Sequence, residues 1–110
     1  MKILITGIAG FGGSGLAATM LKKGHSVTGV DVIAPSEAYR LRGIVDDINY
    51  LWKAVQDITS ADLDGYDAVC DFSAQADVPM GYSSPRWTCE QNLPPLVHIL
   101  EEVRNCSIGK

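Results

Sequence analysis

Glycines are concentrated near the start of the chain, in the segment MKILITGIAGFGGSGL. Gly7, Gly10 and Gly13 stand three residues apart, directly after an apolar run and directly before a segment with helical periodicity. Glycines in this context allow a tight turn, let backbone N–H groups approach a pyrophosphate, and let helix and strand pack closely. Because the positive end of the helix then faces the phosphates, the segment predicts a phosphate-binding loop.

Short apolar runs and helical patterns alternate along the chain. We expect strands within residues 2–6, 26–33, 50–58 and 67–73. We expect helices after Gly13, as a short element within residues 34–47, and near the C-terminus, where Leu96 and Leu100 recur at helical spacing. This order predicts one α/β domain over residues 1–110, a Rossmann-type doubly wound parallel sheet, partial, with strand order 3-2-1-4.

An acidic residue ends the second expected strand. Asp31 follows Gly13 at roughly the 20-residue spacing expected of a carboxylate that binds the adenosine ribose. A carboxylate there accepts hydrogen bonds from both ribose hydroxyls and repels a 2′-phosphate, which favours NAD over NADP. Arg40 and Arg42 follow soon after, so NADP is not excluded.

Other glycine-rich nucleotide sites are alternatives to a dinucleotide site. A P-loop needs a lysine after Gly15, and Leu16 stands there instead. A methyltransferase-type nucleoside site also uses glycines and an acid at a strand end, and it remains a weaker alternative.

Composition excludes several classes of function. A net charge of −4 argues against nucleic acid or an anionic membrane as the main partner. The apolar runs are too short to span a membrane, and no signal-peptide pattern opens the chain. Three widely spaced cysteines indicate reduced thiols in a cytoplasmic protein. Because neither histidine has ligand-spaced companions, no metal site is expected.

Several motifs in order resemble the extended short-chain dehydrogenase/reductases, specifically the NAD-dependent epimerase/dehydratase family that acts on nucleotide sugars. ITGIAGFGGSG resembles the family's TGxxGFxGS opening, and VTGVD resembles its second strand. QDI, DAVCDFSAQADV and SSPRWTCEQN resemble its later motifs. The resemblance covers essentially the whole chain.

The resemblance implies a set of cofactor-binding residues and a reaction. The glycine loop would hold the pyrophosphate with Phe11 packing the loop, Asp31 the ribose, and Asp57 and Ile58 the adenine. The full set is Gly7, Gly10, Phe11, Gly12, Gly13, Asp31, Asp57, Ile58, Ser73, Ala74, Gln75 and Asn92. Of these, Ser73 to Gln75 would line the nicotinamide side and Asn92 matches the family's structural Asn. The implied reaction is transient oxidation of a nucleotide-sugar hydroxyl by bound NAD.

The chain departs from the family pattern at several positions. Gly12 replaces a bulky apolar residue, at a cost of roughly 1 kcal/mol in helix propensity against Ala. Asp71 and Ser73 stand where the family has His and Ala, and an extra acid near the phosphates weakens binding unless it points away. Pro94 and Pro95 predict a broken helix with a fresh start near Pro95.

The family's catalytic Tyr-xxx-Lys pair is absent from the sequence. The tyrosines are followed four residues later by Gly43, Ala54, Cys70 and Arg86. We therefore expect no catalytic residues in this chain and no activity from it alone. The chain ends at CSIGK, where a fifth strand would begin, which indicates the cofactor-binding part of a longer epimerase or dehydratase.

Two further expectations follow from the fourth expected strand. DAVCDFSA is continuous and mostly apolar, which favours a neighbouring fifth strand or self-association, such as a homodimer, through that edge. The alternative function is a stand-alone, non-catalytic dinucleotide-binding or regulatory module.

Overall fold

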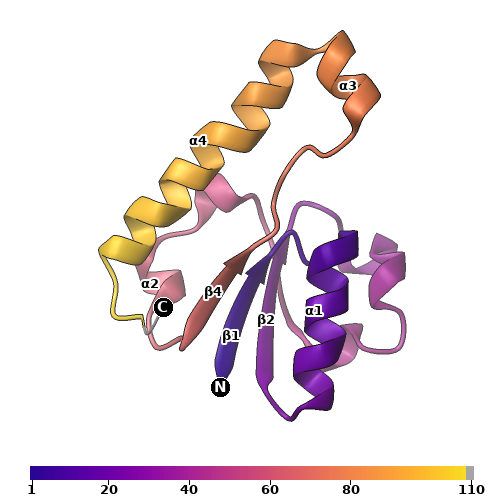
Figure 1. Ribbon diagram of the computed structural model, residues 1–110. Coiled ribbons are helices and arrows are strands. Elements are labelled where there is room, and N and C mark those ends of the chain that lie inside the picture. Colours follow the sequence, from indigo (N-terminus) through magenta and orange to yellow (C-terminus); the bar gives the residue numbers. More distant parts are fainter. Residues whose placement is uncertain (109–110) are drawn as a thin grey trace.

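The computed structural model describes residues 1–108, and its centre is a four-stranded, all-parallel sheet (Figure 1). The strands are β1 (Lys2–Thr6), β2 (Ser26–Asp31), β3 (Asn49–Trp52) and β4 (Ala68–Asp71). Their order across the sheet is β3-β2-β1-β4. The predicted α/β class and the predicted strand order 3-2-1-4 are confirmed. After β3 the chain crosses to the other side of β1, where β4 pairs in parallel.

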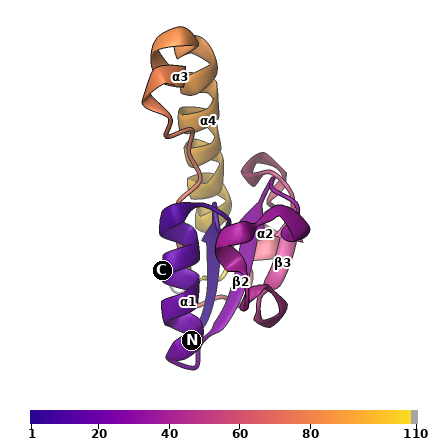
Figure 2. The same cartoon turned by 90° about the vertical axis from the view of Figure 1, so that its right-hand side faces the viewer.

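Helices cover both faces of the sheet. α1 (Phe11–Lys22) packs on one face, whereas α2 (Ser60–Leu63) and α4 (Pro85–Arg104) lie on the other. Figures 1 and 2 show α1 and α4 on opposite sides of the strands, with α3 (Val78–Ser83) beyond the sheet beside the start of α4.

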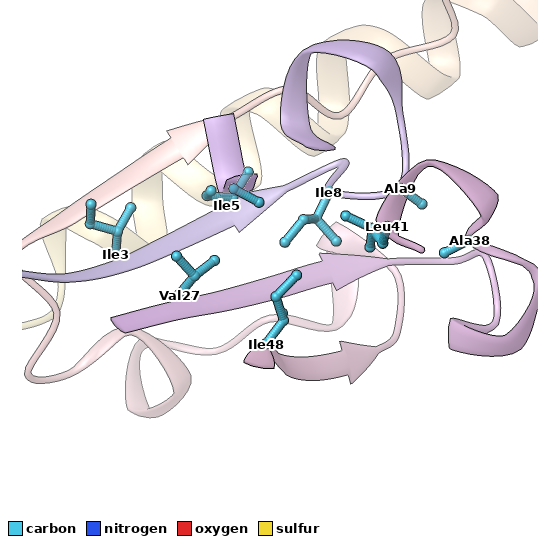
Figure 3. Close-up of a cluster of buried hydrophobic side chains, with 9 residues drawn as sticks. Ile3, Ile5, Ile8, Ala9, Val27, Ala38, Leu41 and Ile48 are labelled. Atoms are coloured by element: carbon cyan, nitrogen blue, oxygen red, sulfur yellow. The ribbon is translucent and has the colours of Figure 1, made fainter. Parts of the chain in front are cut away.

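The alternation of side chains along β1 divides the core into two clusters. Ile3 and Ile5 point to the α1 face, where they join Ile8, Val27 and other buried side chains (Figure 3). Leu4 points to the opposite face and joins a second cluster that includes residues of α2 and α4. Successive strand residues face opposite sides, so one five-residue strand supplies both hydrophobic layers.

β2 and β4 each end at an aspartate, before the end of the apolar run from which the strand was predicted. β2 stops at Asp31, whose Oδ1 accepts the N–H of Ile33 (3.0 Å). β4 stops at Asp71, whose Oδ1 accepts the N–H of Ser73 (3.1 Å). Each bond turns the backbone away from the ladder, as Asx turns do. The expected limits of residues 26–33 and 67–73 were therefore too long.

The irregular segments also differ from expectation. The single short helix expected in residues 34–47 is instead three 3₁₀ turns, η1 (Pro35–Glu37), η2 (Tyr39–Leu41) and η3 (Val45–Asp47). Only the first part of residues 50–58 is extended, and η4 (Val55–Asp57) follows β3. Single apolar side chains that pack into the core, such as the fully buried Leu41, hold these short turns in place.

The prediction of a broken helix at Pro94 and Pro95 is wrong, because α4 runs continuously through both prolines. Each proline removes one backbone donor, which disfavours a helix interior. Tertiary contacts on both sides of the pair hold the helix: Asn92 hydrogen-bonds the backbone of Gln75, and His98 Nε2 donates to the carbonyl of Ile58 (2.7 Å). Pro95 is itself buried, so its packing favours the continuous helix.

Apolar surface remains exposed on α4 and at the sheet edge. Among residues 1–108, β4 pairs only with β1. The exposed apolar side chains of α4 are Trp87, Leu93, Leu96, Val97 and Leu100. No helix in the described part of the chain combines the length and apolar character needed to cross a membrane.

Two glycine-to-alanine substitutions test the packing of this fold. At Gly29 in β2 a Cβ would overlap the side chain of Ile8, whereas at Gly15 in α1 it would meet nothing within 4 Å. We expect Gly29→Ala to lower the free energy of unfolding by about 1–3 kcal/mol through overpacking. Gly15→Ala is the matched control and should raise it by about 0.5–1 kcal/mol. Urea titrations measure both, and equal effects would contradict the packing described.

Candidate functional site

A cleft of about 570 Å³ lies at the carboxyl ends of the strands. Its walls come from the glycine loop after β1, the end of β2, the segment after β4 and one side of α4. Half of the predicted site residues line it, namely Gly7, Gly10, Asp31, Ser73, Ala74 and Gln75. Ligands of open parallel sheets bind at this edge, where the strand order reverses.

The glycine loop has the geometry that its spacing predicts. Gly7 has φ +63°, and a Cβ there would lie 2.6 Å from the carbonyl oxygen of Phe72. A Cβ on Gly13 would overlap the backbone of Gly7, so α1 packs directly against the loop. Gly10 is the N-cap of α1 and provides no side-chain cap, which leaves N–H groups of the first turn to an external acceptor.

Asp31 holds the glycine loop and also faces the cleft. Its Oδ2 accepts the N–H of Ala9 (2.9 Å) while Oδ1 accepts the N–H of Ile33. An ionised carboxylate offers about four acceptor sites. Two sites therefore remain for hydroxyl donors of a ligand.

Tyr50 lies beside Asp31 and is not suited to act as a base. Its hydroxyl donates to the carbonyl of Ile33 (2.7 Å). Burial, and then the negative charge of Asp31, raise the pKa of Tyr50 to about 12. The hydroxyl therefore keeps its proton at ordinary pH and serves to order the end of β2.

The segment after β4 is anchored at its start by Asp71. The Asp71 carboxylate accepts hydrogen bonds from the hydroxyls of Thr6 and Ser73 as well as from the Ser73 backbone. Asp71 is not among the residues that line the cleft. The acid that replaces the family's His thus points away from the cleft.

The same segment is anchored at its far end by α4. Asn92 Oδ1 accepts the N–H of Gln75 (2.6 Å), and Asn92 Nδ2 donates to the Gln75 carbonyl (3.0 Å). The Gln75 side chain donates to Thr88 Oγ1 (3.0 Å) and to the Asp77 carbonyl (3.2 Å). Asn92 therefore supports the wall of the cleft from behind, whereas Gln75 lies in the wall.

Five other predicted residues are not among those that line the cleft. Phe11 is 86% exposed, so its side chain does not pack against the loop. Gly13 lies beneath the loop. Asp57 is exposed and Ile58 is buried in the core, where its side chain is enclosed and unable to pack on an adenine ring.

The fifth residue, Gly12, has a structural reason for lacking a side chain. A Cβ at Gly12 would lie 2.8 Å from Cδ1 of Phe72. The Phe72 ring thus occupies the space that a bulky residue at position 12 would need, and Phe72 itself lines the cleft.

Several residues that line the cleft were missed or given no role. Gln56 and Val55 lie beside the predicted Asp57, and a residue assignment shifted by one position would have found Gln56. Trp87, Gln91 and Pro95 come from α4. Only the tertiary fold brings this helix to the cleft, so no local signal identified them. Arg40, noted as compatible with NADP, does line the cleft.

Within the described residues the cleft offers no metal-binding cluster of His, Cys, Asp or Glu. Its charged side chains are Asp31, Arg40, Lys53 and Asp77. Lys53 Nζ lies 2.7 Å from Asp62 Oδ2, so Lys53 forms a salt bridge with Asp62. The polar groups that the cleft offers are therefore backbone donors and a few polar side chains.

The Lys53–Asp62 pair makes stability depend on pH. The hydrogen bond from Lys53, followed by that from the Thr59 backbone, lowers the pKa of Asp62. A carboxyl group whose pKa is lowered in the folded state stabilises the fold at pH values above its unfolded pKa of about 4. This stabilisation is lost as the pH falls through the folded-state pKa. Because both side chains are partly exposed, we expect Lys53→Met to cost under about 1 kcal/mol at pH 7.

Urea titrations from pH 7 to pH 2 measure this difference, which should shrink below about pH 4. Lys23→Met is the control, since Lys23 is exposed and makes no ion pair within residues 1–108. A difference that stays constant with pH would show that Lys53 acts through packing alone.

Sequence relatives cover the chain almost completely. It is 34% identical over 120 residues to Protein CapI of Staphylococcus aureus, covering 98% of this chain and 35% of that protein. It is 30% identical over 111 residues to UDP-glucose 4-epimerase of Corynebacterium glutamicum, covering 94% of this chain and 31% of that protein. The chain thus spans about a third of the length of these relatives.

Solved structures share the fold. UDP-glucose 4-epimerase from Stenotrophomonas maltophila, with bound NAD and formylated UDP-arabinopyranose, superposes with a TM-score of 0.85 at 23% identity, covering 98% of this chain and 34% of that one. TunA, an NAD-dependent NDP-hexosamine 5,6-dehydratase, gives a TM-score of 0.78 at 26% identity, covering 96% and 34%.

The glycine loop, the strand-end acid and the strand order are thus found together in a chain whose residues 3–110 match one family throughout. That match covers nearly every residue, and the chain belongs to the NAD-dependent epimerase/dehydratase family.

Proposed function

We propose that this chain binds NAD in the cleft and is the cofactor-binding part of a nucleotide-sugar epimerase or dehydratase. The observation that carries the proposal is the glycine cradle: Gly7 and Gly10 open to the same cleft as Asp31. The start of α1 presents N–H donors without a side-chain cap. The cradle suits a pyrophosphate, and the carboxylate suits a ribose.

We propose a place in the cleft for each part of the cofactor. The pyrophosphate would lie at Gly10 and the start of α1, and the adenosine ribose at Asp31. The adenine would lie near Val55 and Gln56, with the exposed Asp57 next to them. The nicotinamide end would then reach Ser73, Ala74 and Gln75 on the opposite side of the cleft.

Asp31 and Arg40 have opposite effects on a 2′-phosphate. The carboxylate of Asp31 accepts ribose hydroxyls and repels a phosphate, whereas Arg40 would attract one. The Arg40 guanidinium lies over the Tyr39 ring, 4.7 Å from its centroid. Since Asp31 is held by two backbone N–H groups and Arg40 is exposed, we propose a preference for NAD.

Bound NAD would accept hydride from the sugar carbon that carries a hydroxyl group, a step that also needs a base for the hydroxyl proton. Tyr50 keeps its proton, and Lys53 is paired with Asp62. We propose that this chain's residues bind and orient the cofactor. Proton transfer and sugar recognition would come from sequence equivalent to the remaining two thirds of the relatives. UDP-sugars are the proposed substrate class, from the names of those relatives.

The alternative is a non-catalytic dinucleotide-binding module in the cytoplasm, favoured by a glycine cradle in a sequence that has no Tyr-xxx-Lys pair. Such a module should be monomeric and unfold in one sharp transition. Dimers that bury the β4 edge or the exposed face of α4 would count against it and would support the proposed homodimer. Sedimentation equilibrium distinguishes these outcomes.

Gly10→Ala tests the cradle directly. A Cβ at Gly10 would come within 3.3 Å of the Gly7 carbonyl oxygen, a tight but tolerable contact, and its φ of −78° suits alanine. The added methyl would occupy the place of the pyrophosphate. We expect NAD affinity, measured by isothermal titration calorimetry, to fall at least about tenfold, or 1.4 kcal/mol.

Gly15→Ala is the matched control, because the same change within α1, five residues further along the chain, meets open space. It should leave NAD affinity within about twofold, well under 1 kcal/mol. Equal NAD affinities of wild type and Gly10→Ala would place the ligand elsewhere.

The absence of a Tyr-xxx-Lys pair from the sequence predicts no turnover by this chain alone. With NAD and UDP-glucose present, we expect no nicotinamide reduction in absorbance measurements and no epimerised sugar by chromatography. A family member of full length, assayed in the same way, is the positive control. Turnover that tracks the purified chain would overturn the assignment of proton transfer to other sequence.

A further inference from the structure

Asp71, the last residue of β4, connects two segments through a single carboxylate oxygen. Oδ1 accepts hydrogen bonds from the hydroxyl of Thr6, from the Ser73 backbone N–H (3.1 Å) and from the Ser73 hydroxyl (2.6 Å). Thr6 is fully buried at the end of β1, and Ser73 lines the cleft. The carboxylate therefore ties a residue of the cleft wall to the interior of the sheet.

Backbone contacts fix the same two segments against each other. The N–H of Phe72 donates to the Thr6 carbonyl (3.2 Å). A Cβ on Gly7 would lie 2.9 Å from the Ser73 nitrogen. Ser73 is thus held at a set position relative to the glycine loop, and Asp71 sets the direction of its hydroxyl.

The direction of that hydroxyl has a chemical consequence. A serine hydroxyl has one proton to donate and two lone pairs to accept with. An ionised carboxylate only accepts, so the Ser73 proton is committed to Asp71. Ser73 can then offer only lone pairs to a ligand in the cleft.

We propose that Asp71 is a positioning residue that orients Ser73 as a hydrogen-bond acceptor for a donor group of the bound cofactor, such as a ribose hydroxyl. Ser73 pairs with a ligand O–H or N–H and disfavours a phosphate oxygen at that point. The inference rests on the proposed binding of NAD and adds a residue that does not itself line the cleft.

Charge and positioning make opposite predictions for Asp71→Asn. NAD carries a negatively charged pyrophosphate, so if Asp71 acted only through its charge, its removal would tighten binding. If Asp71 orients Ser73, an amide that donates to the Ser73 oxygen occupies one of its two lone pairs and leaves the Ser73 proton pointing elsewhere, which weakens binding. The sign of the change in NAD affinity separates the two explanations.

The experiment measures NAD affinity by isothermal titration calorimetry in the whole chain for a set of variants. Asp71→Asn and Ser73→Ala should each weaken binding about tenfold, or 1.4 kcal/mol. The double variant should be no weaker than either single variant, because both remove the same contact. Ser73→Thr keeps a hydroxyl and should restore affinity to within about threefold.

Asp67→Asn is the matched control at the opposite end of the same strand pair. Asp67 Oδ2 accepts the N–H of Lys2 (2.6 Å), far along β4 from the cleft. Its substitution should lower the melting temperature and leave NAD affinity within about twofold. A role of Asp71 in folding alone would make the two Asn variants behave alike.

Unchanged or tighter NAD binding by Asp71→Asn would overturn the inference while leaving the proposed function intact. Additive losses in the double variant would overturn it as well. If Asp71→Asn does not fold, as circular dichroism would show, the Ser73→Ala and Ser73→Thr pair decides: equal affinities overturn the inference. A wild-type chain that binds no NAD would overturn the proposed function and this inference together.

Discussion

The close approach of two backbones at the carboxyl ends of β1 and β4 is the constraint on which the site depends. Gly7 lies against the Phe72 carbonyl so tightly that a side chain cannot be accommodated. This contact sets the turn after β1, and the turn sets where α1 begins and which way its first N–H groups point. The same contact places Ser73 beside the glycine loop. The close packing of Gly7 against Phe72 therefore fixes the glycine loop and the segment after β4 relative to each other.

Two aspartates at strand ends illustrate how context assigns a role to a residue type. Asp31 and Asp71 each accept the N–H of the residue two positions later. Asp31 also accepts the N–H of Ala9 in the loop after β1, and Asp71 accepts the hydroxyl of Thr6 at the end of β1. Asp31 also faces the cleft, whereas Asp71 does not. One acid therefore remains open to a ligand, and the other acts through the residues it holds.

The sequence allowed the sheet to be predicted but only part of the site. Strand order followed from short apolar runs separated by turns, because parallel crossovers leave few topologies. The glycines of the loop were recognised because a tight turn and close helix packing need glycine locally. The helix break predicted at Pro94 and Pro95 was wrong, and the burial of Ile58 and the exposure of Phe11 were not foreseen, because packing in the folded chain decides all three. Trp87 and Gln91 were missed for the same reason, since α4 reaches the cleft only in the folded chain.

The contact between Gly12 and the Phe72 ring limits the order in which these two positions can change during divergence. A larger residue at position 12 requires the Phe72 ring to move away from its present place. A smaller residue at position 72 can arise first, leaving a gap that a later change at position 12 fills. The reverse order passes through an overpacked intermediate. Lineages of this family should therefore exchange the two residues as a pair, with position 72 the first to change.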